Sequence, residues 1–326
     1  MAEPGKISPS KITTYKGCPL AYFLKYVEHV KVPDNVRLVF GKRIHYLLDR
    51  FYEVNFKSPD SFAGFWFGDW RRTISGEHLR GKAKRELQVK EYPYMGRDEH
   101  GNKVEKILKV GNHVDLGDNP VGVFFGYSNL GSSILKRFFE RHKQKPPPLE
   151  RERAFGKRKD EPLEINGHPV TGVFDRIDEM SGEFYITDYK TDKASPGNNS
   201  FILHRHPQFT FYSMAFRMLF GKAEKALLFY HLRTGQVFQT FRSEKDFDYV
   251  KRLIDEVVDG VTRNQFTPFY GFHCNFCDYQ CDACEKYSMP HHGGPRIDLE
   301  GKIKTAESFP VWNQEVPDWI EIQGEE

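Results

Sequence analysis

The sequence lacks any hydrophobic run long enough to cross a membrane, and its first eleven residues lack the hydrophobic core of a signal peptide. It also has few cysteines outside one segment, since four of its five lie between positions 274 and 284. This distribution excludes the disulfide framework of a small secreted protein. No internal repeat or low-complexity tract stands out. These absences predict a soluble, globular, cytoplasmic protein that does not bind membranes.

The net charge is small but unevenly distributed. The formal charge of the 326 residues is +3, yet residues 290–326 contain eight acids and three bases. That segment therefore has a net charge of about −5 and the remainder about +8. Two strongly basic segments, 80–86 and 136–159, are able to meet phosphates or to form ordinary solvated helix faces. The composition permits nucleic acid as a partner without requiring it.

Hydrophobic periodicity and turn signals divide the chain into helical and strand-rich parts. Residues 7–27 should form two helices, separated by a break at Cys18. Residues 40–56 carry apolar side chains at helical spacing, with His45 beside the apolar stripe. We expect strands near 149–156, 162–178 and 183–190, a helix near 206–220, a strand pair around residues 234–235, and a helix over 245–263.

These elements predict an α/β fold with the following organisation. We expect N-terminal helices over 7–56, a helical insertion with loops over 57–145, a core over 146–270, a cysteine cluster over 271–285 and an acidic tail over 286–326.

The stretch "GVFDRIDEMSGEFYITDYKTDK" (172–193) has the pattern of a β-hairpin with its turn at residues 180–183. Strand alternation makes Asp188 and Lys190 project from one face, whereas Tyr189 projects from the other. Asp175 shares its face with apolar neighbours, so its carboxylate needs a partner there. Asp178 points to the opposite face and is interpreted as structural. We therefore expect the side chains of Asp188 and Lys190 to lie next to each other on one face of the strand.

The stretch "CNFCDYQCDAC" (274–284) indicates soft-metal ligation, by zinc or an iron–sulfur centre. A zinc ribbon separates its two CxxC pairs by roughly fifteen residues, whereas only three residues separate Cys277 from Cys281. A centre that uses three of these thiolates and is closed by the distant Cys18 accounts better for the five cysteines. The alternative is a loop of free thiols.

At this point several motifs resemble one family. Asp175 followed by Asp188-Tyr189-Lys190 resembles the signature of the PD-(D/E)XK nucleases, and "GVFDRID" with "ITDYKTDK" resembles their RecB-type branch. "GKRIH" is similar to the G-x-x-x-H helix of that branch, and "HPQFTFY" to its Q-x-x-x-Y helix. "SPSKITTYKGCPLAYFLKY" and the cysteine group resemble the iron–sulfur form found in AddB-type recombination nucleases and CRISPR-associated RecB-like exonucleases. The resemblance spans about residues 7–285.

This resemblance implies a restriction-endonuclease-like core, in which a mixed central sheet is flanked by helices. It also implies an active site that hydrolyses phosphodiester bonds with Mg²⁺ or Mn²⁺. The implied metal ligands are the side chains of His45, Asp175 and Asp188 and the carbonyl oxygen of Tyr189. Lys190 would orient or deprotonate the attacking water and offset charge at the phosphate.

Three further residues are implied in supporting roles. Gln208 and Tyr212, one helical turn apart, would touch the substrate backbone or brace the catalytic lysine. Glu152, in "ERAF", matches a frequent acid of the family and is expected to support the metal ligands from outside.

The resemblance also implies a 4Fe–4S cluster held by Cys18, Cys274, Cys277 and a fourth cysteine. The expected spacing is C-x2-C-x5-C, but here Cys281 follows after three residues and Cys284 after six. We favour Cys284, because a loop absorbs a one-residue insertion more easily than a two-residue deletion. Cys281 is the alternative.

The implied function is that of a metal-dependent DNA exonuclease acting on single-stranded ends in recombination, repair or replication. A helicase or recombination protein is a possible partner. Three alternatives remain open at this point: a nuclease-inactive DNA-binding subunit, a zinc-stabilised interaction module, and a restriction-type endonuclease.

Overall fold

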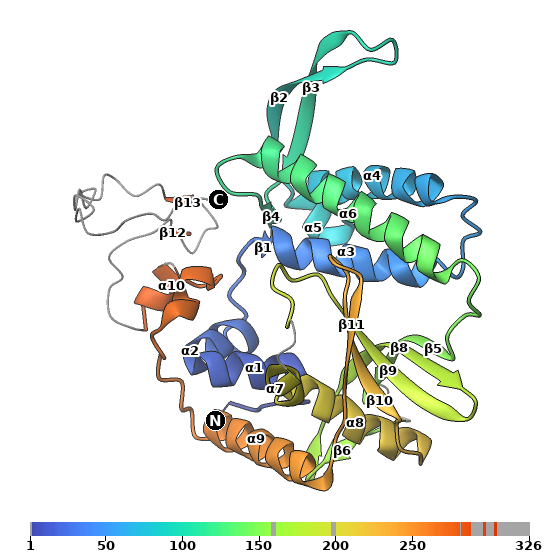
Figure 1. The fold of residues 1–326 in the computed structure, drawn as a ribbon. Helices are drawn as coiled ribbons and strands as arrows, with labels where there is room; N and C mark the ends of the chain where they lie inside the picture. Colours follow the sequence, from blue (N-terminus) through green and yellow to red (C-terminus); the bar gives the residue numbers. More distant parts are fainter. Residues whose placement is uncertain are drawn as a thin grey trace, which may run out of the picture.

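A mixed five-stranded β-sheet forms the centre of the computed structural model, which describes residues 2–157, 161–196, 200–280, 282–287, 296–297 and 303–304. The strand order is β11-β10-β9-β8-β5, with β9 and β10 parallel and the other neighbours antiparallel. Helices cover the sheet (Figure 1). The predicted α/β class is therefore confirmed. Within the described residues no helix is both long and apolar enough to cross a membrane.

The helices are α1 (Pro9–Gly17), α2 (Pro19–Tyr22), the π-helix η1 (Phe23–Val27), α3 (Val36–Arg50), α4 (Pro59–Ser75), α5 (Gly81–Arg85), α6 (Pro120–His142), α7 (Ser200–His204), α8 (Pro207–Phe220), α9 (Glu244–Thr262), the 3-10 helix η2 (Phe272–Phe276) and α10 (Asp282–Glu285). The sheet strands are β5 (Glu150–Phe155), β8 (Gly172–Met180), β9 (Glu183–Lys190), β10 (Ala226–His231) and β11 (Gln236–Thr240). The remaining strands form pairs: β1 (Asp34–Asn35) with β4 (Val114–Asp115), β2 (Val89–Arg97) with β3 (Lys103–Gly111), β6 (Glu164–Ile165) with β7 (His168–Pro169), and β12 (Arg296–Ile297) with β13 (Ile303–Lys304).

Two hydrophobic cores lie on opposite faces of the sheet. The first joins the sheet to α1, α8 and α9. The second joins it to α3, α4 and α6, and includes the rings of Tyr189 and Tyr230 from β9 and β10. In the second core α4 and α6 approach so closely that a Cβ at Gly131 would lie 2.3 Å from the Trp66 ring. Glycine is therefore required at this crossing.

The N-terminal helices begin and break where the sequence indicates. The Ser8 side chain accepts a hydrogen bond from the Lys11 amide and caps α1. Cys18 then adopts an extended backbone (φ −159°), and Pro19 starts α2. The break directs the Cys18 side chain away from the helical path.

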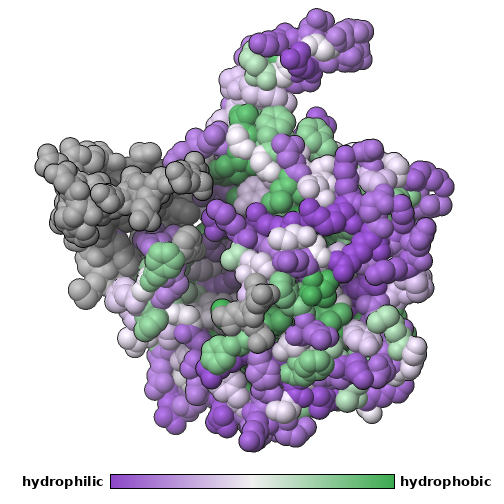
Figure 2. All heavy atoms as spheres, in the orientation of Figure 1, coloured by the Kyte–Doolittle hydropathy of each residue, from purple (hydrophilic) through white to green (hydrophobic). Residues whose placement is uncertain are grey.

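Two expectations about local structure are wrong in part. The segment 57–145 contains the helices α4 and α6, but it also contains the hairpin β2–β3, which projects from the body (Figure 1). The hairpin buries few side chains and its outer end is hydrophilic (Figure 2), so it lacks a clear alternating pattern. The strand expected over 162–178 is instead the small hairpin β6–β7 followed by β8, because Asn166 and Gly167 both have positive φ.

Part of the basic segment 136–159 serves the fold. Arg137 donates to the carbonyls of Leu232 and Arg233 at 3.1 and 2.6 Å, and Arg141 donates to the Gly235 carbonyl. These contacts hold the turn between β10 and β11. Apart from the short pair β12–β13 and residues up to 287, the expected acidic tail lies outside the described residues.

Candidate active site

The candidate site lies where two neighbouring strands of the sheet separate. The antiparallel pairing of β8 and β9 ends at Arg176–Thr187. At the preceding residue of β8, an Asp175 carboxylate oxygen accepts a hydrogen bond from the Tyr189 amide at 2.7 Å. The side chain thus takes the place of a backbone partner. The separation opens the sheet next to the last residues of β9.

Asp188 and Lys190 project from β9 toward α8. Lys190 Nζ lies 2.7 Å from Asp188 Oδ2 and donates to Gln208 Oε1 at 2.9 Å. Gln208 Nε2 is 2.8 Å from both Asp188 Oδ1 and the Tyr212 hydroxyl. Only 2% of the Asp188 side chain is exposed, compared with 21% of the Lys190 side chain. Gln208 and Tyr212 therefore hold the acid and the lysine in one arrangement.

A second group of ligand atoms comes from three different elements. His45 of α3, Glu152 of β5 and Asp175 of β8 each place one such atom within 4.8 Å of the others. His45 Nδ1 is 3.4 Å from Asp175 Oδ1 and 4.0 Å from Glu152 Oε1. Glu152 reaches this group from a backbone with φ +43°, a strained conformation for a residue with a side chain. Strain of this kind is common at functional sites.

Burial and mutual charge perturb these groups. Burial and the Asp175 charge raise the pKa of Glu152 to about 7. Burial also raises the pKa of Asp188, whereas the His45 imidazole outweighs burial and lowers the pKa of Asp175. Burial opposes the charged form of His45, but the Asp175 contact prevails and raises its pKa to about 9. The Asp188 carboxylate likewise outweighs burial and raises the pKa of Lys190.

This donor set fits a hard divalent cation. Carboxylate oxygens are the preferred ligands of Mg²⁺ and Mn²⁺, and an imidazole nitrogen suits Mn²⁺. Three acids, Glu152, Asp175 and Asp188, converge near the cationic side chains of His45 and Lys190. A cation between the ligand atoms would relieve the repulsion among the acids.

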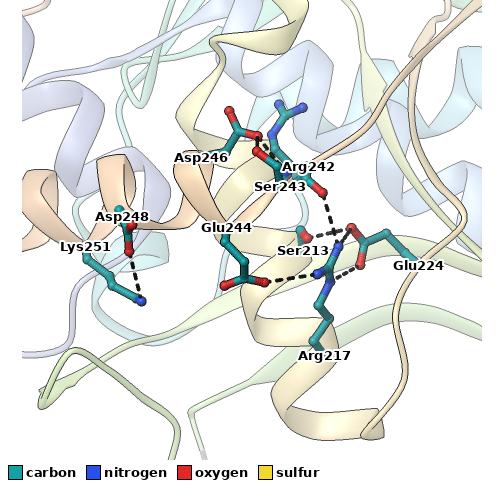
Figure 3. Close-up of polar contacts among 9 residues, drawn as sticks. All are labelled: Ser213, Arg217, Glu224, Arg242, Ser243, Glu244, Asp246, Asp248 and Lys251. Carbon is teal, nitrogen blue, oxygen red and sulfur yellow. Dashed lines mark hydrogen bonds and ion pairs between the residues drawn. The ribbon is translucent and has the colours of Figure 1, made fainter.

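Buried polar contacts fix α8, the helix that carries Gln208. Figure 3 shows Glu224 accepting from Ser213 at 2.6 Å and from Arg217 Nε at 3.0 Å. Near the start of the helix, the buried Arg242 guanidinium donates to the Thr210 hydroxyl at 2.6 Å and to the Leu203 carbonyl at 3.2 Å. Both ends of α8 are therefore anchored independently of the site.

Similar contacts hold the chain that follows Lys190. Arg233 Nε donates to the Thr191 carbonyl at 2.6 Å, and His231 Nε2 donates to the Asp192 carbonyl at 2.9 Å. On the other side, a Cβ at Gly41 of α3 would lie 3.2 Å from Thr191 Oγ1. The loop after the lysine is thus packed between β10 and α3.

The thiols of Cys18, Cys274, Cys277 and Cys284 line one pocket, with Phe269 also in its wall. The Phe269 amide is 3.5 Å from Cys18 Sγ. Burial, together with the nearby Cys284 and Cys18, raises the pKa of Cys277 to about 11. A bound metal would be needed to hold these sulfurs as thiolates. Cys281 lies outside the described residues.

The structure thus brings the residues singled out in the sequence into two places. His45, Glu152, Asp175, Asp188, Lys190, Gln208 and Tyr212 meet at the separated strands, and the four described cysteines meet at the second pocket. The Tyr189 ring points into the core on the α3 side, as strand alternation requires. Asp178 pairs with Arg176 at 2.6 Å, consistent with a structural role. Arg233 and His231 carried no signal in the sequence, because their contacts are to backbone carbonyls.

A protein-family model described as "PD-(D/E)XK nuclease superfamily" matches residues 6–284 of this chain. A solved structure titled "Crystal structure of SSO0001" is similar at 18% identity with a TM-score of 0.31, over 49% of this chain and 77% of that chain. No curated protein matches the sequence.

Proposed function

The chain belongs to the PD-(D/E)XK nuclease superfamily, and from this membership we propose that it is a metal-dependent DNA exonuclease of the RecB type. The observation that carries the proposal is the convergence of Asp175, Asp188 and Lys190 at the separated end of β8 and β9. A nuclease-inactive DNA-binding subunit would not need this complete set of acids and a lysine. An active enzyme is therefore the better reading.

His45, Asp175 and Asp188 would hold Mg²⁺ or Mn²⁺, with the Tyr189 carbonyl as a further ligand. The bound cation would neutralise charge on the phosphate and lower the pKa of a coordinated water. Lys190 would orient the attacking water and offset negative charge in the transition state. Gln208, which contacts both Lys190 and Asp188, would keep these two side chains in register, and Tyr212 would brace Gln208.

We also propose that Glu152 ligates the metal directly. The sequence pattern suggested a supporting role, but the Glu152 carboxylate lies as near to His45 as a ligand would. Its positive φ aims the side chain away from the regular direction of β5. A strained backbone that serves ligand placement explains this geometry.

Glu152→Gln should weaken Mn²⁺ binding by about 10- to 100-fold. When Mn²⁺ is limiting, the rate of DNA cleavage should fall by a similar factor. The amide keeps the size of the side chain but removes the charge. Glu150→Gln, two residues away on the same strand, is the matched control and should behave as wild type. Mn²⁺ affinity is measured by isothermal titration. Equal Mn²⁺ affinities for Glu152→Gln and wild type would show that Glu152 supports the metal ligands without binding the metal.

A 4Fe–4S cluster bound by Cys18, Cys274, Cys277 and Cys284 is proposed for the second pocket. The shared pocket and the amide contact to Cys18 support it. The competing zinc-stabilised module predicts colourless protein. A protein that holds an iron–sulfur cluster is expected to be brown and to absorb broadly at about 400 nm.

For the substrate, we propose linear single-stranded DNA degraded from an end. With Mn²⁺ or Mg²⁺, purified protein should degrade end-labelled linear single strands and spare covalently closed circles. Duplex of the same sequence serves as the comparison. Rapid cutting of closed circles would instead indicate an endonuclease. Absence of cleavage on every DNA with either metal would overturn the nuclease proposal.

A further inference from the structure

Two exposed aromatic rings lie on α3 and α7, helices that supply or directly precede site residues, and each ring has an arginine guanidinium over it. Tyr46 follows His45 on α3, is 42% exposed, and has the Arg43 guanidinium 4.2 Å from its ring centre. Phe201 of α7 is 58% exposed and has the Arg205 guanidinium 4.0 Å from its ring centre. Single exposed aromatic residues are common and need no explanation. What sets these two apart is the paired cation and their place in the chain close to His45 and to α8.

The two rings belong to elements that reach the site from opposite faces of the sheet. α3 packs in the second core and supplies His45, whereas α7 leads directly into α8, which supplies Gln208. Figure 2 shows hydrophobic side chains gathered on this face, between the levels of α3 and α8 in Figure 1. A strand of nucleic acid whose phosphate reaches Lys190 would have α3 on one side and α7 with α8 on the other.

The platform on α3 is rigid before any ligand binds. Arg43 Nε donates to Asp69 Oδ2 at 3.0 Å, and Nη2 donates to Oδ1 at 2.5 Å. Asp69 is itself buried at 7% exposure, so it fixes the guanidinium over Tyr46. One turn earlier on α3, the Lys42 side chain is 58% exposed and its ammonium lies 3.1 Å from Asp34. The Tyr46 ring is thus held by a guanidinium that is itself fixed by an acid.

We propose that Tyr46 and Phe201 are stacking platforms for unpaired bases on either side of the scissile phosphate. The proposal rests on the proposed nuclease function and specifies how that site selects single strands. A duplex keeps its base faces stacked inside, so a protruding ring stacks only on an unpaired base. The arginines add a cation to each platform and favour an anionic strand over an apolar protein surface.

The test measures binding of a single-stranded oligonucleotide that contains 2-aminopurine, with EDTA present to stop metal-dependent cleavage. Tyr46→Ala and Phe201→Ala should each weaken binding by about 5- to 150-fold, the range for loss of one stacked base. Both should also lose the fluorescence quenching that stacking causes. Binding to blunt duplex should change little. Tyr249→Ala, which removes a 47% exposed tyrosine from α9, is the control and should match wild type.

Conservative variants separate stacking from simple apolar contact. Tyr46→Trp and Phe201→Trp should keep binding and quenching, whereas the Leu variants should lose quenching. Because both side chains are exposed, the melting temperature should change little in all six variants. Wild-type affinity in the two Ala variants, or equal weakening for single strand and duplex, would overturn the proposal.

The outcome is distinguishable from failure of the nuclease proposal. If the wild type cleaves no DNA but the Ala variants lose quenching, the platforms stand and the catalytic proposal fails. If the wild type cleaves single strands but the Ala variants bind as wild type, the catalytic proposal stands and the platforms fail.

Discussion

Lys190→Ala is expected to reduce DNA cleavage by about 10³-fold or more, with DNA binding retained. The lysine is the one cation within 3 Å of Asp188 among the described residues, and it points at the site together with Asp188 and Gln208. Removing it leaves nothing to orient the attacking water or to offset charge at the phosphate. Cleavage is followed under single-turnover conditions on end-labelled single strands. Lys193→Ala, an exposed lysine three residues away, is the matched control.

The effect on stability needs its own control. Loss of one member of a buried ion pair destabilises a fold, because the other charge loses its partner. Removal of Asp188 relieves repulsion among the acids, but it also takes the partner at 2.7 Å away from Lys190. The double variant Asp188→Asn/Lys190→Ala removes both charges. It should melt closer to wild type than Lys190→Ala and remain inactive. Full activity in a folded Lys190→Ala variant would reject the assignment of this site.

Cys18→Ala should give protein with depleted iron, a lower melting temperature and protease sensitivity near both ends of the described chain. Cys18 lines the same pocket as Phe269, which comes 251 residues later in the chain. The strands of the sheet and helices from both of its faces lie between these two positions in the sequence. A crosslink that closes so long a loop restricts the unfolded chain, by about 5 kcal/mol on the disulfide analogy. Iron content, absorbance and thermal melting are recorded together.

The matched comparison is between the two candidates for the fourth ligand. Cys284 lines the pocket, so Cys284→Ala should lose iron as Cys18→Ala does, whereas Cys281→Ala should be milder. A Cys18→Ala protein with its full complement of iron and wild-type melting would contradict the cluster. A zinc site formed by the remaining four cysteines would then be the better account.

Much of the site could be predicted from the sequence, because strand alternation is a local property. Asp188 and Lys190 two residues apart must share a face, and the helical stripe beside His45 defines which way that histidine turns. Cys18 was recognisable because a cysteine between a glycine and a proline lies at a helix break. Each of these inferences needs only a few neighbouring residues.

The parts that the sequence did not indicate depend on tertiary context. Glu152 approaches His45 and Asp175 from a backbone with positive φ, and no spacing rule signals that conformation for a glutamate. The hairpin β2–β3 projects from the body, and in β2 all side chains are at least partly exposed, so the apolar signal of a buried face is weak. The separation of β8 from β9 could not be predicted from the sequence either. Nothing in the sequence indicates that the Asp175 carboxylate replaces a backbone hydrogen-bond partner.

The central claim is that the separated end of β8 and β9 holds a divalent cation and hydrolyses DNA with it. The most direct test is a Mn²⁺ titration that follows bound Mn²⁺ and single-strand cleavage in the same samples, for wild type and Asp175→Asn. We expect wild-type cleavage to rise in step with bound Mn²⁺ and to stop when EDTA is added, and we expect Asp175→Asn to lose both binding and cleavage. Cleavage that persists in EDTA, or that survives in Asp175→Asn, would contradict the account.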